Sequence, residues 1–235
     1  MKILVIGGMH GNEPLGIGLV ELFKESPQKN VEAVIANEKA VKINSRFVKS
    51  DLNRSFPGNS RSYDWETKRS AELLGLCREF DLVLDFHNTH CPNNDCSFLG
   101  ESAKDNLYTI SGWLGLRRVI VADYDCINKY APNCLSVEIS LGGKMMSAQM
   151  WYDKISKLAD LNTEPVVKKL EVYKFVYRLT LEDRNKYNLA SQKLRAFKPI
   201  SASLTSSLNL EWPAYPIFIG DKYTPYNYGG ILSKV

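Results

Sequence analysis

The sequence of 235 residues lacks most features that mark membrane, secreted or fibrous proteins. No apolar run approaches the ~20 residues that a helix needs to cross a bilayer. Only three histidines are present, and the five cysteines form no CxxC pair. Because the cysteine count is odd and zinc-finger spacing is absent, the sequence predicts reduced thiols rather than a disulfide framework. With 44% hydrophobic and 24% charged residues, the composition is that of an ordinary globular chain.

Neither sign of charge dominates, since the sequence has 30 basic and 26 acidic residues and a net charge of +4. The basic residues form no cluster with interleaved aromatic residues, so we expect no nucleic-acid partner. The mild excess of positive charge suits a small acidic ligand. Four apolar residues precede Gly7, too few for the apolar stretch of a signal peptide. We therefore expect a cytoplasmic protein without a membrane partner. The sequence is compatible with a homo-oligomer.

Short apolar, β-branched runs alternate with helical periodicity through the first 160 residues. Strands are predicted at 2–6, 31–36, 81–86, 119–122 and 135–139. Helices are predicted from Pro14 onward and at 65–80, 103–116 and 148–158, with a short helix or turn at 37–44 before the polar loop 45–62. The alternation predicts an α/β fold, with a mainly parallel or mixed sheet and helices on both faces.

The character of the sequence changes after Pro165. Residues 170–181 read LEVYKFVYRLTL, which is rich in β-branched and aromatic residues, and several prolines and the pair Gly229-Gly230 follow. This composition is typical of short strands separated by turns. We therefore predict two units, a main α/β unit over 1–164 and a small β-rich C-terminal unit over 165–235.

Two of the three histidines follow predicted strands. His10 lies in GGMHGNE with Glu13 three residues on, and His87 follows LVLDF with Asp85 two residues before it. In open α/β sheets, ligands bind at the carboxyl ends of the strands. Two imidazoles and a carboxylate supply three zinc ligands and leave the fourth position open. Asp85 could accept a hydrogen bond from the ring nitrogen of His87 that does not bind metal.

The HxxE spacing alone is unspecific, and a histidine at a strand end is often a buried structural residue. Two further segments favour a reactive site. Arg46, Asn53 and Arg54 lie in the polar loop, and guanidinium groups suit carboxylates and polarised carbonyls. Glu138 interrupts the apolar strand LSVEI, where an unpaired carboxylate is costly. The alternative for Glu138 is the exposed face of an edge strand.

Other catalytic motifs are absent from the sequence. GGMHGNE contains neither the GK[ST] of a phosphate loop nor a GxGxxG dinucleotide motif, and GxSxG, HExxH and the zinc-deaminase pair do not occur. Cys126 and Cys134 lie close to Glu138 in sequence, which leaves a cysteine nucleophile as an alternative. Buried, inert thiols are the simpler interpretation of all five cysteines.

Taken together, several segments resemble the aspartoacylase and succinylglutamate desuccinylase family, whose members are relatives of the zinc carboxypeptidases. The similar segments are GGMHGNE, NEKAVKINSRFVKSDLNRSFPG, DFHNTH and SVEIS, with weaker similarity in LEVYK and YPIFIGDKY. The resemblance implies one zinc ion per chain, held by His10, Glu13 and His87. It also implies that Arg46 polarises the scissile carbonyl and that Glu138 is the general base.

The same resemblance implies the parts that bind substrate. Asn53 and Arg54 look like the pair that grips a substrate carboxylate, and Tyr130 and Tyr223 resemble tyrosines that contact the substrate. Residues 1–164 are expected to form a zinc carboxypeptidase-like catalytic domain, and residues 165–235 to wall its active site. The family also has an arginine between the equivalents of Tyr130 and Glu138, and this sequence lacks it.

The expected activity is hydrolysis of a small acidic N-acyl amino acid, as in the conversion of N-acetyl-aspartate to acetate and aspartate. A succinylglutamate desuccinylase, a deacylase of another small acylated amine and a small carboxypeptidase acting on peptides are alternatives. A non-catalytic protein that binds zinc and an acidic metabolite is the alternative from a different class.

Overall fold

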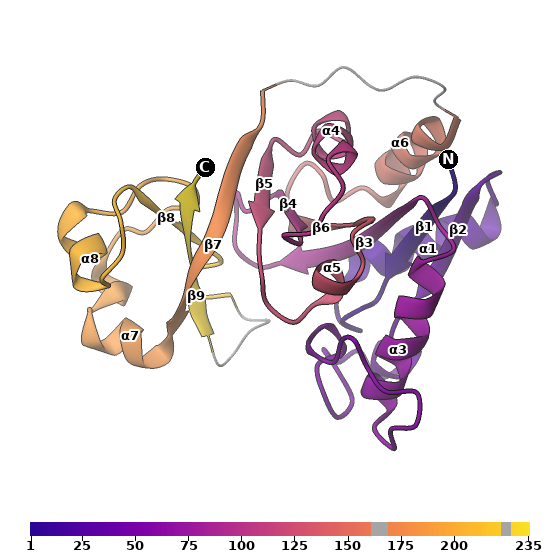
Figure 1. Cartoon of the computed structure of the whole chain (residues 1–235), viewed down its shortest axis with the longest axis horizontal. Helices are drawn as coiled ribbons and strands as arrows, with labels where there is room; N and C mark the ends of the chain where they lie inside the picture. The colour runs from indigo at the N-terminus through magenta and orange to yellow at the C-terminus, as the bar shows by residue number, and fades with distance from the viewer. Residues whose placement is uncertain (161–168, 222–226) are drawn as a thin grey trace.

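One mixed sheet organises the chain, and the computed structural model describes residues 1–160, 169–221 and 227–235 (Figure 1). Within those ranges the sheet has nine strands in the order β2-β1-β3-β6-β4-β5-β7-β9-β8. The strands are β1 (Ile3–Gly7), β2 (Val31–Ile35), β3 (Leu82–Thr89), β4 (Cys96–Leu99), β5 (Arg118–Val121), β6 (Cys134–Ser140), β7 (Glu171–Thr180), β8 (Ala214–Ile217) and β9 (Asn227–Lys234).

Parallel pairing predominates in the first part of the sheet. Strands β2, β1, β3 and β6 are parallel neighbours, β4 pairs with β6 in the antiparallel direction, and β5 is parallel to both β4 and β7. Strands β8 and β9 add antiparallel pairs at the far edge. The predicted α/β fold with a mainly parallel or mixed sheet is confirmed.

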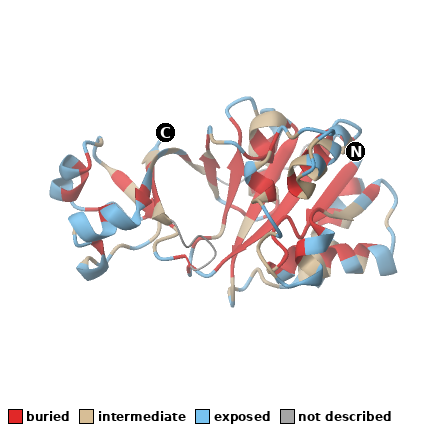
Figure 2. Ribbon diagram, turned by 90° about the horizontal axis from the view of Figure 1, so that it is seen from below, coloured by how far each residue is buried: buried red, intermediate tan, exposed pale blue. Residues whose placement is uncertain are grey.

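Helices cover both faces of this sheet. The helical elements are α1 (Pro14–Glu25), α2 (Glu38–Lys42), η1 (Leu52–Arg54), α3 (Trp65–Cys77), α4 (Asn106–Trp113), α5 (Ile127–Tyr130), α6 (Ala148–Asp160), α7 (Leu181–Lys186), η2 (Leu189–Ser191) and α8 (Ala202–Ser207). Alternate residues of β1 point to opposite faces, so Ile3 joins a core with α1, α4 and α6, whereas Leu4 joins a core with α3 and α5. In Figure 2 the central strands are buried between these helices.

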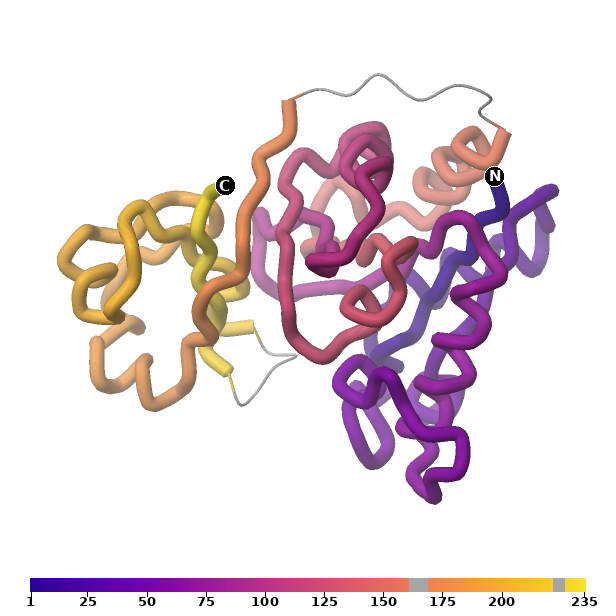
Figure 3. Tube along the Cα trace, viewed as in Figure 1, coloured from indigo at the N-terminus to yellow at the C-terminus, as the bar shows by residue number. Residues whose placement is uncertain are grey.

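The C-terminal segment extends the same sheet. Strand β7 pairs with β5, and Figure 3 shows the chain passing from β7 through the helical segments and returning beside it as β9. This segment also contains α7 and α8, and it encloses an apolar cluster of its own around Leu179, Leu204 and Ile231. The division at 164/165 stays a prediction, since that boundary lies outside the described residues.

The carboxyl ends of β1 and β3 share one edge of the sheet because the strands are parallel. After β1 the chain turns sharply through Gly8, whose φ of 65° suits glycine. A β-carbon on Gly7 would lie 2.0 Å from the carbonyl oxygen of Gly16, so α1 can pack against the strand end only because both residues are glycine. This close approach places the loop 8–13 over the carboxyl ends of β1 and β3.

Candidate metal centre and active-site pocket

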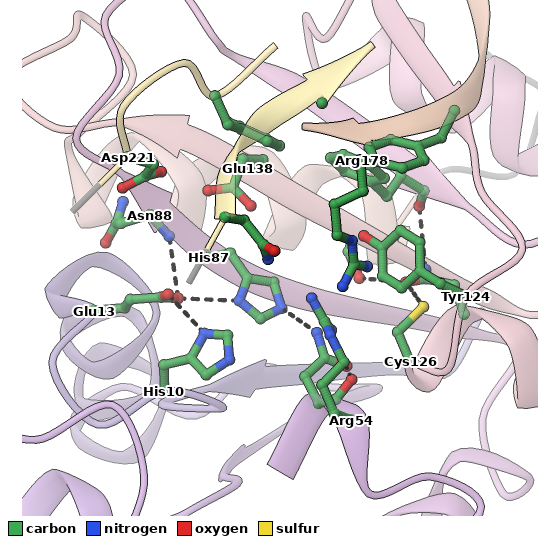
Figure 4. A pocket seen from close by; sticks show the side chains of 18 of the residues that line it. His10, Glu13, Arg54, His87, Asn88, Tyr124, Cys126, Glu138, Arg178 and Asp221 are labelled. Atoms are coloured by element: carbon green, nitrogen blue, oxygen red, sulfur yellow. Dashed lines mark hydrogen bonds and ion pairs between the residues drawn. The ribbon is translucent and has the colours of Figure 1, made fainter. Parts of the chain in front are cut away.

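Three side chains meet at this edge of the sheet. His10, Glu13 and His87 each offer one ligand atom, and these atoms all lie within 4.8 Å of one another. The Glu13 carboxylate bridges the two rings, with Oε1 2.7 Å from Nδ1 of His10 and Oε2 3.0 Å from Nδ1 of His87 (Figure 4). All three side chains are buried. The structure thus brings together residues separated by 74 positions in the chain.

Carboxylates hold the far side of both rings. Nε2 of His87 is 2.7 Å from Oδ2 of Asp85, and Nε2 of His10 is 3.1 Å from Oδ1 of Asp51. This pattern fixes both rings with Nδ1 toward Glu13, as carboxylates do for metal-bound histidines. Burial alone would raise the pKa of Glu13, but the two imidazoles hold the pKa of this carboxyl well below its usual value. The carboxylate is therefore ionised, as a metal ligand must be.

This donor set fits zinc. Two imidazole nitrogens and one carboxylate oxygen are a zinc combination found in hydrolases, with the fourth position left for water or substrate. Among residues 1–160, 169–221 and 227–235, no other group of three or more His, Cys, Asp or Glu side chains has metal-binding geometry.

Replacing Asp85 by asparagine is expected to weaken zinc binding about 10- to 100-fold, because the ring of His87 loses its anionic partner. Asp85 is fully buried, and its Oδ2 also accepts a hydrogen bond from Ser136, at 3.1 Å. Competition with a chromogenic chelator measures the affinity. The control is Asp153→Asn on the exposed face of α6. Equal zinc affinity in Asp85→Asn and the wild type would contradict the assigned role.

Glu138 stands beside the metal cluster. It lies on β6, where its Cα is the register partner of His87 on β3. Because β6 lies between β3 and β4, the alternative of an exposed edge strand is wrong. Burial raises the pKa of Glu138 well above its usual value, and the carboxylates of Glu13 and Asp221 add to the rise. A carboxyl group with a raised pKa beside a metal cluster is suited to proton transfer.

Arg46 reaches the cluster from the polar loop. Its Nε and Nη2 donate to Oδ2 of Asp51, at 3.1 and 2.9 Å, and its Nη1 lies 3.8 Å from Oε1 of Glu13. Hydrogen bonds to α3 hold this loop in place, because the buried carboxylate of Glu66 accepts from the backbone N–H groups of Val48 and Lys49. Arg46 thus presents a positive charge beside the metal cluster.

The next turn, η1, carries Asn53 and Arg54 into the same pocket. Oδ1 of Asn53 accepts a hydrogen bond from the backbone N–H of Ile127, at 3.2 Å, which ties η1 to α5. Tyr130 is not among the described residues that line the pocket. Its hydroxyl instead donates a hydrogen bond to Oδ1 of Asp125, at 2.9 Å. Tyr223 lies outside the described residues.

The pocket continues beyond the residues that the sequence indicated. It encloses about 860 Å³, including the space at its mouth. Its far wall contains Phe98, Tyr124, Phe175, Arg178 and Phe218. Three of these, Phe175, Arg178 and Phe218, come from the C-terminal segment. Sequence reasoning missed them because they belong to no motif and meet only through pairing of distant strands.

The five cysteines are free and buried. Burial raises the pKa of the Cys77 thiol to about 12 and that of Cys91 to about 11. Cys126 lines the pocket, but burial raises its pKa as well, so it lacks the thiolate character of a nucleophile. The interpretation of buried, inert thiols fits these environments.

The sequence and the fold both match known proteins. Residues 1–132, just over half of the chain, match the sequence profile of the succinylglutamate desuccinylase/aspartoacylase catalytic domain. The chain belongs to this family. The resemblance noted in the sequence is confirmed.

Individual relatives match over shorter stretches. A segment of 114 residues (41% of this chain and 36% of the relative) is 32% identical to the N-acyl-aromatic-L-amino acid amidohydrolase (carboxylate-forming) of Rattus norvegicus. A segment of 103 residues (37% and 35%) is 33% identical to a probable aspartoacylase of Trichodesmium erythraeum (strain IMS101). The matched region thus spans about a third of the length of these curated relatives.

Solved structures share the fold over the whole chain. A succinylglutamate desuccinylase from Chromobacterium violaceum superposes with a TM-score of 0.73 and 17% identity, covering 100% of this chain and 84% of that one. Murine aminoacylase 3 superposes with a TM-score of 0.72 and 20% identity, covering 100% and 95%. Among the described residues, no helix is long and apolar enough to cross a membrane.

Proposed function

We propose that this protein is a zinc-dependent hydrolase that cleaves the amide bond of small N-acyl amino acids, with N-acetyl-aspartate as the leading substrate. One observation carries the proposal: a buried His-Glu-His cluster opens into a pocket that also contains Glu138 and Arg46. A protein that only binds zinc and a metabolite has no need of a proton acceptor beside the metal cluster. The arrangement therefore favours catalysis over simple binding.

His10, Glu13 and His87 would hold the zinc ion. Bound there, zinc supplies Lewis acidity, which activates water at neutral pH and polarises a carbonyl group. Glu138 takes the proton from the attacking water and delivers it to the leaving amine. Arg46 faces the carbonyl oxygen and stabilises the negative charge that develops on it. Asn53 and Arg54 orient the substrate through its α-carboxylate.

The C-terminal segment limits the size of the substrate in this proposal. Phe175, Arg178 and Phe218 line one side of the pocket. We expect this wall to admit a short acyl-amino acid and to exclude a long peptide. A desuccinylase remains the second candidate, supported by the structural similarity to succinylglutamate desuccinylase. The rat relative suggests aromatic N-acyl amino acids as a third substrate group.

A substrate panel tests the proposal. The zinc-loaded protein is incubated with N-acetyl- and N-succinyl-amino acids that carry acidic, neutral or aromatic side chains, and the released amine is quantified. We expect turnover of N-acyl amino acids, fastest with N-acetyl-aspartate, and none of peptides of six or more residues. Absence of amine release from every N-acyl amino acid, or equal cleavage of long peptides, would contradict the proposal.

A further inference from the structure

A bulge in β7 turns an arginine into the pocket. Phe175 pairs with Leu232 of β9, but the next pair along the strand is Tyr177 with Ile231, so β7 holds one extra residue at Val176. In a regular strand, Phe175 and Arg178 would point to opposite faces. The extra residue restores Arg178 to the face of Phe175, because a bulge shifts the alternation by one position. Both side chains consequently line the pocket.

The strand opposite leaves space for this arginine. The register partner of Arg178 is Gly230, so no side chain stands beside it across the ladder. A β-carbon on Gly230 would lie 2.5 Å from Cε2 of Phe175 and would displace its ring from the pocket wall. The Gly229-Gly230 pair, unexplained by the sequence, therefore keeps this end of the pocket open.

Two guanidinium groups converge on one ring at this end. Cζ of Arg54 lies 4.8 Å from the ring centroid of Tyr124, and Cζ of Arg178 lies 5.6 Å from it. Figure 4 shows both guanidinium groups directed toward the space beside Tyr124. Within the described ranges, neither arginine forms an ion pair with a carboxylate. Two positive charges thus face the pocket, and neither has a described carboxylate within ion-pair distance.

We propose that Arg178 is a specificity-determining residue that binds a substrate carboxylate additional to the α-carboxylate, which Asn53 and Arg54 hold. The pocket then selects dicarboxylic N-acyl amino acids over neutral and aromatic ones. A guanidinium that is free of an ion pair with the protein can pair with a substrate carboxylate, and the Tyr124 ring lies against both cations. The extra carboxylate belongs to the amino-acid side chain or to the acyl group, and both sources present the same chemistry. This inference rests on the proposed function.

Steady-state kinetics with three substrates test the assignment. N-acetyl-aspartate carries the extra carboxylate on the side chain, N-succinyl-alanine carries it on the acyl group, and N-acetyl-alanine lacks it. We expect Arg178→Ala to lower kcat/KM at least about 10-fold for whichever dicarboxylic substrate places its charge here, mainly through KM. For N-acetyl-alanine, which has no second carboxylate, kcat/KM should fall far less than for that dicarboxylic substrate. Arg178→Lys should restore part of the loss.

Lys174→Ala is the matched control. Lys174 lies on the same strand before the bulge, is exposed, pairs with Glu101 and does not line the pocket. This variant should leave all three kcat/KM values unchanged. An equal loss for N-acetyl-alanine and the dicarboxylic substrates in Arg178→Ala would assign a merely structural role to Arg178 and overturn the proposal. Unchanged kinetics for every substrate would overturn it as well.

A binding measurement separates this inference from the proposed function. Calorimetric titration of the zinc-loaded wild type and of Arg178→Ala with L-aspartate, succinate and L-alanine requires no turnover. We expect weaker binding of at least one dicarboxylate in Arg178→Ala, with L-alanine unaffected. If the wild type hydrolyses nothing but shows this difference, the proposed function fails and the carboxylate subsite stands. Identical dicarboxylate affinities in both proteins would refute the subsite.

Discussion

Glu138→Gln is expected to lower kcat by at least about 100-fold while one zinc ion per chain remains bound. Glutamine has nearly the shape of glutamate but cannot accept the proton of the attacking water. Glu138 lies beside the metal cluster without belonging to it, so its substitution should spare the metal. Amine release and metal analysis on the same preparation measure both quantities.

Glu101→Gln is the control for this substitution, because Glu101 is exposed and pairs with Lys174 at the surface. Its kcat should equal that of the wild type. A Glu138→Gln variant that retains the full rate would contradict the base assignment. Loss of zinc together with activity would instead place Glu138 among the residues that maintain the metal centre.

His87→Ala is expected to reduce the zinc content from one ion per chain to almost none and to abolish hydrolysis. Removal of one of three protein ligands leaves His10 and Glu13 only, too few for a stable zinc site. Inductively coupled plasma mass spectrometry after dialysis measures the zinc content, and circular dichroism verifies the fold.

His90→Ala tests whether the loss is specific. His90 follows His87 by three residues but is exposed and does not belong to the metal-binding group. This variant should keep both zinc and activity. A folded His87→Ala protein that retains one tightly bound zinc ion would show that the metal is held elsewhere.

Much of the fold and the metal cluster could be predicted from the sequence. Strand β3 begins with the apolar run 82–84, and α1 begins at Pro14 and repeats apolar residues at helical spacing. These local signals depend on burial of one strand or one helix face, so they are visible without the tertiary structure. His10 follows β1 and His87 lies near the carboxyl end of β3, and parallel strands bring their carboxyl ends to one edge of the sheet.

The rest of the pocket depends on tertiary contacts. Strand β4 holds only four residues and was not predicted, although it contributes Phe98. Arg178 enters the pocket because of a one-residue bulge, and no sequence pattern in a strand reports such a shift in register. Asp51 orients His10 across 41 positions in the chain, a pairing that becomes visible only when the polar loop is folded.

A crystal of the zinc-loaded protein measured at the zinc absorption edge tests the central claim most directly. The account predicts one anomalous peak per chain, bonded to Nδ1 of His10, Nδ1 of His87 and the Glu13 carboxylate at about 2.0–2.2 Å. A peak at any other group of side chains, or no peak in a crystal soaked with zinc, would contradict it.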